Sequence, residues 1–419
     1  MVANQHACWS SGFVTRIRSG AALAQGKNSV NHRSSGDSYD VIIVGSGPAG
    51  ASAALDLAAA GVRVAILERE FPPRYKTCGG GVVHRAFGLA PPGVRDAVVR
   101  DCFTSEMNLL DAGLRFETRS QVPIVSMTMR EHFDFLLLSA AKEAGAHFRP
   151  GCEVTDVFQG DERVELQTST GSLRAPFVIA ADGVAATVAR KLRLPDGRRL
   201  IPALECEVFV GGGVFERFAN SARFDFGVVP YGYGWVFPKK EHLSVGVLTM
   251  CRGGAKLNER FGAYLRRLGI VPLRDPERHG ALIPVAPRRA PFTAGRVLLV
   301  GDAAGFADPL TGEGITFALL SGRAAARALV DGNLRAEAVG RAYDGEIAAK
   351  ILPELRVARV LATMLYGHPA LRKLLFRLYG HRFSDAMADI LTGNGTYRSA
   401  VRRPANYLKL LKMRGRRPG

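Results

Sequence analysis

A short apolar strand that runs straight into a glycine-rich turn constrains the fold of this chain more than any other feature. Residues 41–44 read Val-Ile-Ile-Val, a run typical of strands covered on both faces of a parallel sheet. Residues 45–50 follow at once as Gly-Ser-Gly-Pro-Ala-Gly, which matches the pattern G-x-G-x-x-G. In this pattern Gly45 permits the tight turn, Gly47 lets the backbone approach a pyrophosphate, and Gly50 lets the next helix pack closely on the strand. The stretch predicts a strand–turn–helix unit that binds a nucleotide.

The residues after the turn complete such a unit. Residues 49–60 are rich in alanine and predict a helix, whose N-terminus offers free N–H groups and a positive dipole end to a phosphate. Gly61 ends this helix, and residues 62–67 predict a second apolar strand. Glu68 closes the strand 18 residues after Gly50, where an acidic side chain accepts hydrogen bonds from an adenosine ribose. The order of strand, turn, helix, strand and acid favours a dinucleotide fold over an isolated glycine turn.

A distant strand indicates which dinucleotide to expect. Residues 297–300 are apolar and run into Gly301 and Asp302. A carboxylate at that strand end suits the ribityl hydroxyls that only a flavin carries, although Asp302 also suits a simple helix N-cap. Residues 309–315 then lead into a helix predicted over 316–329, whose first amides suit the N1/O2 edge of a reduced flavin. The two segments together predict FAD.

A third segment lies between these two. Residues 177–181 form an apolar run that ends in Asp182 and a glycine. This resembles the Asp-Gly segment of flavoproteins related to the aromatic hydroxylases, which usually continue with a serine and then an arginine. Here Ala186 and Ala189 stand at those places, and Arg190 comes one residue later. The segment therefore indicates the same fold, and it gives no basis for a nicotinamide-docking role.

Two further stretches carry a more specific resemblance. Residues 74–81 read Arg-Tyr-Lys-Thr-Cys-Gly-Gly-Gly, and residues 230–238 read Pro-Tyr-Gly-Tyr-Gly-Trp-Val-Phe-Pro. They resemble the Cys-Gly-Gly signature and the Y-x-W-x-F-P substrate motif of the geranylgeranyl reductase family, FAD proteins related to the p-hydroxybenzoate hydroxylase-like flavoproteins. The resemblance covers residues 38–330. Members of that family reduce carbon–carbon double bonds of isoprenoid chains, so the resemblance implies an FAD-dependent oxidoreductase.

The motifs and the resemblance together imply three sets of site residues. The expected cofactor contacts are Gly45, Gly47, Pro48, Ala49, Gly50, Glu68, Arg69, Cys78, Gly79, Gly80, Arg130, Asp182, Gly301, Asp302, Gly312, Gly314 and Ile315. The expected substrate contacts are Tyr233, Trp235, Phe237 and Pro238. The catalytic candidates are Cys78, Tyr231 and Tyr233, the two tyrosines by position only.

Two of these residues allow a plainer interpretation. Cys78 suits a redox-responsive thiol or an active-site wall, and a lone cysteine is also often a small buried hydrophobe. Its neighbouring glycines let the backbone pass close to a flavin or substrate. Arg130 precedes a helix, where related flavoproteins place an arginine on the cofactor, but an arginine on the helix surface is an equal alternative.

Aromatic residues crowd the region of the second motif. Phe209, Phe215 and Phe224 are interpreted as ordinary core of a second domain. The rings of the motif itself instead predict a wall for an apolar, unfunctionalised ligand, since ring faces bury much area at low entropy cost.

Composition excludes several classes of protein. With 419 residues, 47% hydrophobic and 22% charged, the chain suits one large or two joined globular domains. Six cysteines, at positions 8, 78, 102, 152, 206 and 251, show no metal-ligand or C-x-x-C spacing. No metal site and no disulfide framework are expected, and a reducing compartment follows.

The net charge of +18 points to a negatively charged partner. Residues 371–379 and 407–417 combine leucines with Lys and Arg, and no run of 18 apolar residues exists to span a bilayer. We expect a cytoplasmic protein in peripheral contact with the inner face of a membrane. The alternative is a solvated helix with a disordered tail. No nucleic-acid motif accompanies the charge, so no nucleic acid is expected.

The chain begins with a polar, acid-poor stretch. Residues 1–37 hold no acid before Asp37, and they lack the apolar core of a secretory signal. The stretch is interpreted as a disordered extension or a mis-assigned start, with an organellar transit peptide as the alternative.

The predicted fold class is α/β. A Rossmann-type FAD-binding domain is expected from three pieces, 38–85, 120–190 and 285–335. A substrate domain with an antiparallel sheet is inserted mainly over 191–284, and residues 336–419 form a C-terminal helical region with a basic tail.

The predicted reaction is hydride transfer from reduced flavin to an isoprenoid double bond, with NADPH or a ferredoxin-type protein as electron donor. The same fold also serves flavin monooxygenases and halogenases. Halogenases carry W-x-W-x-I-P where residues 233–238 read Tyr-Gly-Trp-Val-Phe-Pro, and this departure argues against halogenation. A third alternative is a membrane-associated flavoprotein that only carries a lipid.

Overall fold

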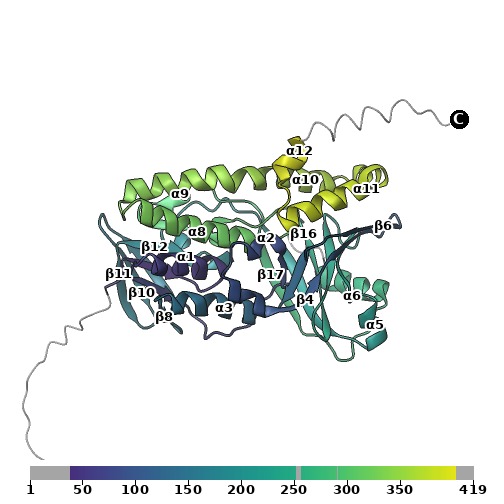
Figure 1. Cartoon of the computed structure of the whole chain (residues 1–419), viewed down its shortest axis with the longest axis horizontal. Coiled ribbons are helices and arrows are strands. Elements are labelled where there is room, and N and C mark those ends of the chain that lie inside the picture. The colour runs from purple at the N-terminus through teal and green to yellow at the C-terminus, as the bar shows by residue number, and fades with distance from the viewer. Residues whose placement is uncertain (1–37, 252–255, 290, 403–419) are drawn as a thin grey trace, which may run out of the picture. The chain divides into compact units, whose positions relative to one another are not determined.

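The computed structural model describes residues 38–251, 256–289 and 291–402 (Figure 1). Two features expected from the sequence, the extension 1–37 and the basic stretch 407–417, lie outside the described residues. Residues from Ser38 onward cluster as one unit.

A six-stranded sheet carries the glycine-rich turn. Its order is β18-β19-β12-β1-β2-β8, and every neighbouring pair is parallel except β18 with β19. All residues of β1, β2 and β12 are buried, as expected for apolar strands covered on both faces. The strands are β1 (Val41–Val44), β2 (Val64–Leu67), β8 (His147–Arg149), β12 (Phe177–Ala180), β18 (Thr293–Ala294) and β19 (Val297–Leu299).

Helices pack beside this sheet. Helix α1 (Pro48–Ala59) lies between α3 (Arg130–Glu143) and α8 (Ile315–Asp331), and α9 (Ala336–Lys350) packs on α8 (Figure 1). A three-stranded antiparallel sheet contributes to the same core and consists of β9 (Val154–Gln159), β10 (Val164–Thr168) and β11 (Gly171–Ala175). The short helices α4 (Thr187–Lys191) and α7 (Gly301–Ala304) follow strands β12 and β19.

A seven-stranded sheet forms the second half of the unit, in the order β17-β13-β16-β15-β14-β5-β6. All its pairs are antiparallel except β14 with β5. Strands β5 and β6 extend the sheet beyond the segment 191–284 expected from the sequence. The strands are β5 (Thr104–Leu109), β6 (Leu114–Arg119), β13 (Leu200–Phe209), β14 (Ser221–Phe226), β15 (Gly232–Pro238), β16 (His242–Thr249) and β17 (Arg278–Pro284).

Helices cover this sheet as well. The amphipathic helix α6 (Leu257–Leu268) buries an apolar stripe in a cluster with β13 and β16, close to α5 (Gly212–Glu216). The C-terminal helices α10 (Leu352–Gly367), α11 (Pro369–Thr392) and α12 (Tyr397–Arg402) share another cluster with β5, β6, β14 and β15. Figure 1 shows α11 beside β6.

A small three-stranded sheet links the two halves. It consists of β3 (Gly81–Val83), β7 (Val125–Thr128) and β4 (Val98–Cys102), with helix α2 (His84–Phe87) and a 3₁₀ turn (Pro92–Ala97) beside it. Strand β3 directly follows the Cys-Gly-Gly stretch. This sheet therefore fixes the C-terminal end of that loop.

Candidate active site

A cavity of about 640 Å³ is lined by residues of both large sheets. It collects residues from the glycine turn, the Cys-Gly-Gly stretch, the aromatic motif and the segment around Asp302. The expected site residues that line it are Gly45, Gly47, Pro48, Ala49, Glu68, Arg69, Cys78, Gly79, Gly80, Arg130, Asp182, Tyr233, Trp235, Phe237, Asp302, Gly312, Gly314 and Ile315.

Four expected residues do not line the cavity. A Cβ on Gly50 would stand 1.9 Å from the Gly45 carbonyl oxygen, so Gly50 serves the close packing of helix on strand. Gly301 donates its N–H to the Ser321 hydroxyl at 2.9 Å, behind the site. Pro238 ends β15. Tyr231 is 47% exposed on the turn before β15, and this position corrects its interpretation as a catalytic candidate.

The glycine turn has the geometry that a bound phosphate needs. Gly45 adopts φ +103°, and a Cβ there would lie 2.4 Å from the Ala181 carbonyl oxygen. Gly47 caps α1, which begins at Pro48, so the free N–H groups of the first helical turn open beside the cavity.

The carboxylate of Glu68, at the end of β2, is fixed in place by hydrogen bonds. It is 6% exposed, and its Oε2 accepts hydrogen bonds from the Ser46 N–H at 3.0 Å and the Ser46 hydroxyl at 2.6 Å. Burial raises the pKa of this carboxyl, but the bonds from Ser46 and the charge of Arg74 outweigh burial and lower it overall. The charged form retains lone pairs for a ribose.

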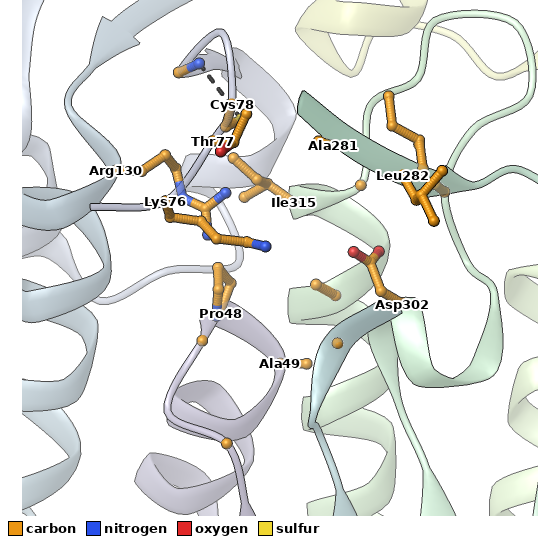
Figure 2. Close-up of a pocket in the computed structure, with 18 of the residues that line it drawn as sticks. Pro48, Ala49, Lys76, Thr77, Cys78, Arg130, Ala281, Leu282, Asp302 and Ile315 are labelled. Carbon is orange, nitrogen blue, oxygen red and sulfur yellow. Dashed lines mark hydrogen bonds between the residues drawn. The ribbon is translucent and has the colours of Figure 1, made fainter. Parts of the chain in front are cut away.

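Asp302 faces cationic side chains across the cavity. In Figure 2 its carboxylate points toward the ammonium group of Lys76, and Arg130 lies beside Lys76. Burial raises the pKa of Asp302 against the opposing effect of Lys76 and Arg130, and burial together with Arg130 lowers the pKa of Lys76. Lys76 was missed as a site residue because no pattern distinguishes it within residues 74–81.

Asp302 does not cap a helix. The residue at the N-cap of α7 is Val300, and no side chain caps that helix. Within the described ranges no hydrogen bond reaches the Asp302 carboxylate, which leaves it free for a ligand. The alternative interpretation of Asp302 as a structural N-cap is therefore wrong.

Cys78 lies on the cavity wall, so it is not a buried core cysteine. Its N–H donates to Glu205 Oε2 at 3.0 Å, and its sulfur accepts from the Gly80 N–H at 3.4 Å (dashed in Figure 2). Arg130 is paired with Asp134 at 2.8 Å and also interacts with the thiol. The Arg130 side chain is only 10% exposed, so the alternative of a surface arginine is wrong. Burial lowers the pKa of Arg130, but the effects of Asp134 and Cys78 are larger and raise it overall.

The glycines after Cys78 leave room for their neighbours. A Cβ on Gly79 would stand 2.7 Å from Trp235 Nε1, and one on Gly81 would stand 2.9 Å from the Phe237 ring. The buried ammonium group of Lys239 donates to the carbonyl oxygens of Gly79 and Thr128, both at 2.7 Å. Lys239 therefore anchors this loop, although no sequence pattern marked it.

An aromatic wall lines the cavity next to this loop and consists of Phe224, Tyr233, Trp235 and Phe237. The indole of Trp235 lies over Gly246, where a Cβ would stand 2.1 Å from the ring. Its buried Nε1 has no hydrogen-bond partner among the described residues. Phe224 lines the cavity, which corrects its assignment to the core alone, whereas Phe209 and Phe215 do not line it.

Tyrosines connect this wall to the turn before α8. The Tyr233 hydroxyl donates to the Thr311 carbonyl, and burial raises the pKa of Tyr233. From the C-terminal helices, the Tyr366 hydroxyl donates to the Leu310 carbonyl, and the Tyr397 hydroxyl donates to Asp308 at 2.7 Å. The turn that faces the expected flavin edge is therefore braced from the helical region.

The residues present fit FAD. The glycine turn and the start of α1 form a cradle that Cβ atoms would fill. Asp302 offers an unengaged carboxylate, and Asp182 Oδ1 is buried without a partner among the described residues, while its Oδ2 accepts the Val188 N–H at 2.8 Å. These acceptors suit the hydroxyl-rich part of a flavin dinucleotide.

Comparison with known proteins supports an FAD-binding protein. Residues 38–210 match the FAD binding domain family. The chain is 32% identical over 378 residues to digeranylgeranylglycerophospholipid reductase 2 of Methanothermobacter thermautotrophicus, covering 85% of this chain and 92% of the relative. It is 31% identical over 324 residues to the chloroplastic geranylgeranyl diphosphate reductase of Nicotiana tabacum, covering 72% of this chain and 68% of the relative.

Solved structures share the fold. A geranylgeranyl bacteriochlorophyll reductase-like protein from Thermoplasma acidophilum matches with a TM-score of 0.71 at 22% identity, covering 84% of this chain and 92% of that chain. The flavin-dependent brominase Bmp2 matches with a TM-score of 0.65 at 20% identity, covering 85% and 93%. The expected α/β fold class is confirmed, and this chain belongs to the geranylgeranyl reductase family of FAD-dependent oxidoreductases.

Proposed function

We propose that the protein saturates carbon–carbon double bonds of an isoprenoid chain of the geranylgeranyl type. The observation that carries this proposal is that the aromatic wall and the flavin-suited residues share one cavity. When bound, FAD supplies the hydride that such a reduction requires. The names of the two relatives, which concern a digeranylgeranyl lipid and geranylgeranyl diphosphate, support an isoprenoid substrate.

Each part of the cavity would have a distinct task. The glycine turn and α1 would bind the pyrophosphate, Glu68 the ribose and Asp302 the ribityl chain. The rings of Tyr233, Trp235 and Phe237 would bind the alkene and exclude water from it. Because an isolated alkene is a poor hydride acceptor, alignment and exclusion of water would provide much of the rate enhancement.

The alternative is a monooxygenase or halogenase of the same fold, in which reduced flavin meets oxygen. The brominase shares the fold, which supports this class only at the level of architecture. Residues 233 and 237 are Tyr and Phe where the halogenase motif has Trp and Ile. The departure favours the reductase.

An anaerobic turnover tests the proposal. The purified protein is reduced with dithionite, mixed with geranylgeranyl diphosphate, and its lipid is analysed by mass spectrometry. The expected result is a gain of two hydrogens per reduced bond together with oxidation of the flavin. An unchanged lipid, with flavin oxidised only when oxygen is admitted, would instead support the monooxygenase class. Rates of flavin reduction by NADPH and by reduced ferredoxin then distinguish the two candidate electron donors.

We also infer a peripheral membrane contact through the outer faces of α10 and α11. Val360, Met364, Leu374 and Leu378 are 58%, 37%, 53% and 52% exposed there. Arg356, Arg359, Arg377 and Arg382 are exposed on the same two helices, and no ion pair engages them within the described part of the chain. Apolar residues among free cations suit an anionic lipid surface. None of the described helices is long and apolar enough to cross a membrane.

A further inference from the structure

Reduction of an alkene requires a proton as well as a hydride, and the two tyrosine candidates do not supply it. Tyr231 lies outside the cavity lining, and the Tyr233 O–H is donated to the Thr311 carbonyl. The described residues nevertheless include a carboxyl group on the aromatic side of the cavity. This group is Glu205 on β13, which lines the cavity and is 1% exposed.

The sheet register places Glu205 in one row with Trp235. Glu205 is paired with Gly246 on β16, and Gly246 is paired with Trp235 on β15. Residues paired across strands project to the same face of a sheet. Because Gly246 has no side chain, the indole lies over it, toward the position of Glu205. The carboxyl is therefore a neighbour of the surface on which an alkene would lie.

A route to solvent leads away from Glu205. Its Oε1 accepts the Tyr75 O–H at 2.9 Å, and Tyr75 is 43% exposed with its ring centroid 4.5 Å from that of His279. A hydroxyl between a buried carboxyl and water can hand protons inward by exchanging its hydrogen-bond partners. The second oxygen, Oε2, accepts only the Cys78 N–H among the described residues.

The surroundings of Glu205 bring its titration close to neutral pH. Burial and the like charge of Glu207 raise the pKa of Glu205 to about 7, against the effects of Tyr75, the Cys78 N–H and Lys239. His279 faces it from β17 in the sheet register. A carboxyl with such a pKa can both give up a proton and regain it at physiological pH.

We propose that Glu205 is the proton donor of the reduction, reprotonated from solvent through Tyr75. This inference rests on the proposed function. The alkene π bond breaks as one carbon takes a hydride from the reduced cofactor and the other takes the Glu205 proton. The product is the saturated bond, and a Glu205 carboxylate remains. Solvent returns the proton by way of Tyr75, and the external electron donor restores the two electrons.

The sequence provides a reporter that does not depend on turnover. The chain contains two tryptophans, Trp9 and Trp235, so W9F leaves Trp235 as the only tryptophan. In full-length W9F protein as isolated, we expect Trp235 fluorescence to change with pH around a midpoint of about 7. The double variant W9F/E205Q should lose this transition. The control W9F/E207Q should keep it with a lower midpoint, because the repelling charge is removed.

The anaerobic turnover with geranylgeranyl diphosphate completes the test. We expect E205Q to form product at least about a hundredfold more slowly at unchanged flavin content, because general acids contribute factors of that order. E207Q keeps the acid, so it should still form product, with the pH profile of its rate shifted to lower pH because the repelling charge is removed. E205D, which keeps an acid set back by one methylene, should regain part of the rate, and it serves as the test variant if E205Q does not fold.

The outcomes separate the two proposals. A wild-type protein that leaves the lipid unchanged overturns the reductase function and this inference with it. A wild type that reduces the lipid while E205Q matches it in rate and pH profile overturns the role of Glu205 alone. A fluorescence transition that persists in W9F/E205Q also overturns it, because the titrating group would then lie elsewhere.

Discussion

Single residues in the cavity hold charge that the protein itself leaves unsatisfied. No hydrogen bond reaches the carboxylate of Asp302 or the ammonium group of Lys76 within the part of the chain that the structure describes. Burial raises the pKa of Asp302 and lowers that of Lys76, so it favours the neutral form of each. Buried charges without full partners cost stability. Side chains kept at such a cost are typical of a site whose ligand provides the missing partners.

Replacing Asp302 by alanine is expected to weaken flavin retention at least about tenfold, because a hydrogen bond to a charged group contributes about 1.5–3 kcal/mol. Asp302→Asn keeps the shape of the side chain and one hydrogen-bond acceptor, so its flavin retention should fall between those of the wild type and D302A. The measurement is the ratio of flavin to protein after extended dialysis. Equal retention by D302A and the wild type would show that this carboxylate does not hold the cofactor.

The raised pKa of Glu205 predicts how stability depends on pH. Its ordinary value of 4.5 rises to about 7 in the folded protein, so folding favours the protonated form. The stability that this provides is fully present below pH 4.5 and is lost as the pH rises through 7. The free energy of unfolding of the wild type should therefore fall as the pH rises from about 5 to about 8, whereas the Glu205 contribution is absent in E205Q. Over this range the difference between E205Q and the wild type should shift by about 2 kcal/mol in favour of E205Q. Urea unfolding at both pH values measures the difference, and a constant difference would contradict the prediction.

Motifs predicted some cavity residues and could not predict others. Asp302 and Cys78 stand in short patterns whose chemistry follows from local sequence, and both line the cavity. Lys76, Glu205 and Lys239 were missed because their roles depend on which segments the fold brings together. A lysine that anchors a loop 160 residues away through the Gly79 carbonyl leaves no local signal.

At the level of elements, the close packing of α1 on α8 supports the glycine turn. A Cβ on Gly322 of α8 would stand 2.2 Å from the Ala49 carbonyl oxygen, which is backbone and cannot move aside. Gly322→Ala is therefore expected to lower the free energy of unfolding by about 1–3 kcal/mol and to reduce flavin content. Gly345→Ala is the matched control, because a Cβ on this exposed residue of α9 meets nothing within 4 Å. It should raise stability by up to about 1 kcal/mol, and thermal unfolding compares the two.

The apolar helices were predictable from the sequence, whereas a buried strand with polar residues was not. The helix expected over 49–60 occupies Pro48–Ala59, and the one expected over 316–329 occupies Ile315–Asp331. The sequence does not predict strand β5, because this strand reads Thr-Ser-Glu-Met-Asn-Leu and lacks an apolar run. Its Glu106 and Asn108 are nevertheless buried, since Arg223 pairs with Glu106 at 2.7 Å and Asn108 donates to Asp225 at 2.8 Å. Buried strand residues that hydrogen-bond to one another give a polar sequence, and such a sequence looks the same as that of a surface loop.

At the level of the whole molecule, the net charge of +18 and the outer faces of α10 and α11 favour the same partner. We expect the double variant L374E/L378E to reduce binding to vesicles of phosphatidylcholine and phosphatidylglycerol at least about tenfold, because it removes apolar contact and adds repulsion. V271E/L273E is the control, since Val271 and Leu273 are 72% and 71% exposed before β17. Co-sedimentation at low and high salt measures binding. An equal loss of vesicle binding in both variants would mean that net charge alone, and not the outer faces of α10 and α11, determines binding.

The bracing of the turn before α8 has a consequence for biosynthesis. Asp308 in this turn accepts a hydrogen bond from the hydroxyl of Tyr397, which belongs to the last described helix. The hydroxyl of Tyr366 on α10 donates a hydrogen bond to the Leu310 carbonyl. The glycine turn, by contrast, comes from the first residues of the unit. A nascent chain on the ribosome therefore makes the glycine turn long before it makes the tyrosines that brace the turn before α8. Firm loading of the cofactor is then expected only after α12 has been made and has packed, which makes it a late step of maturation.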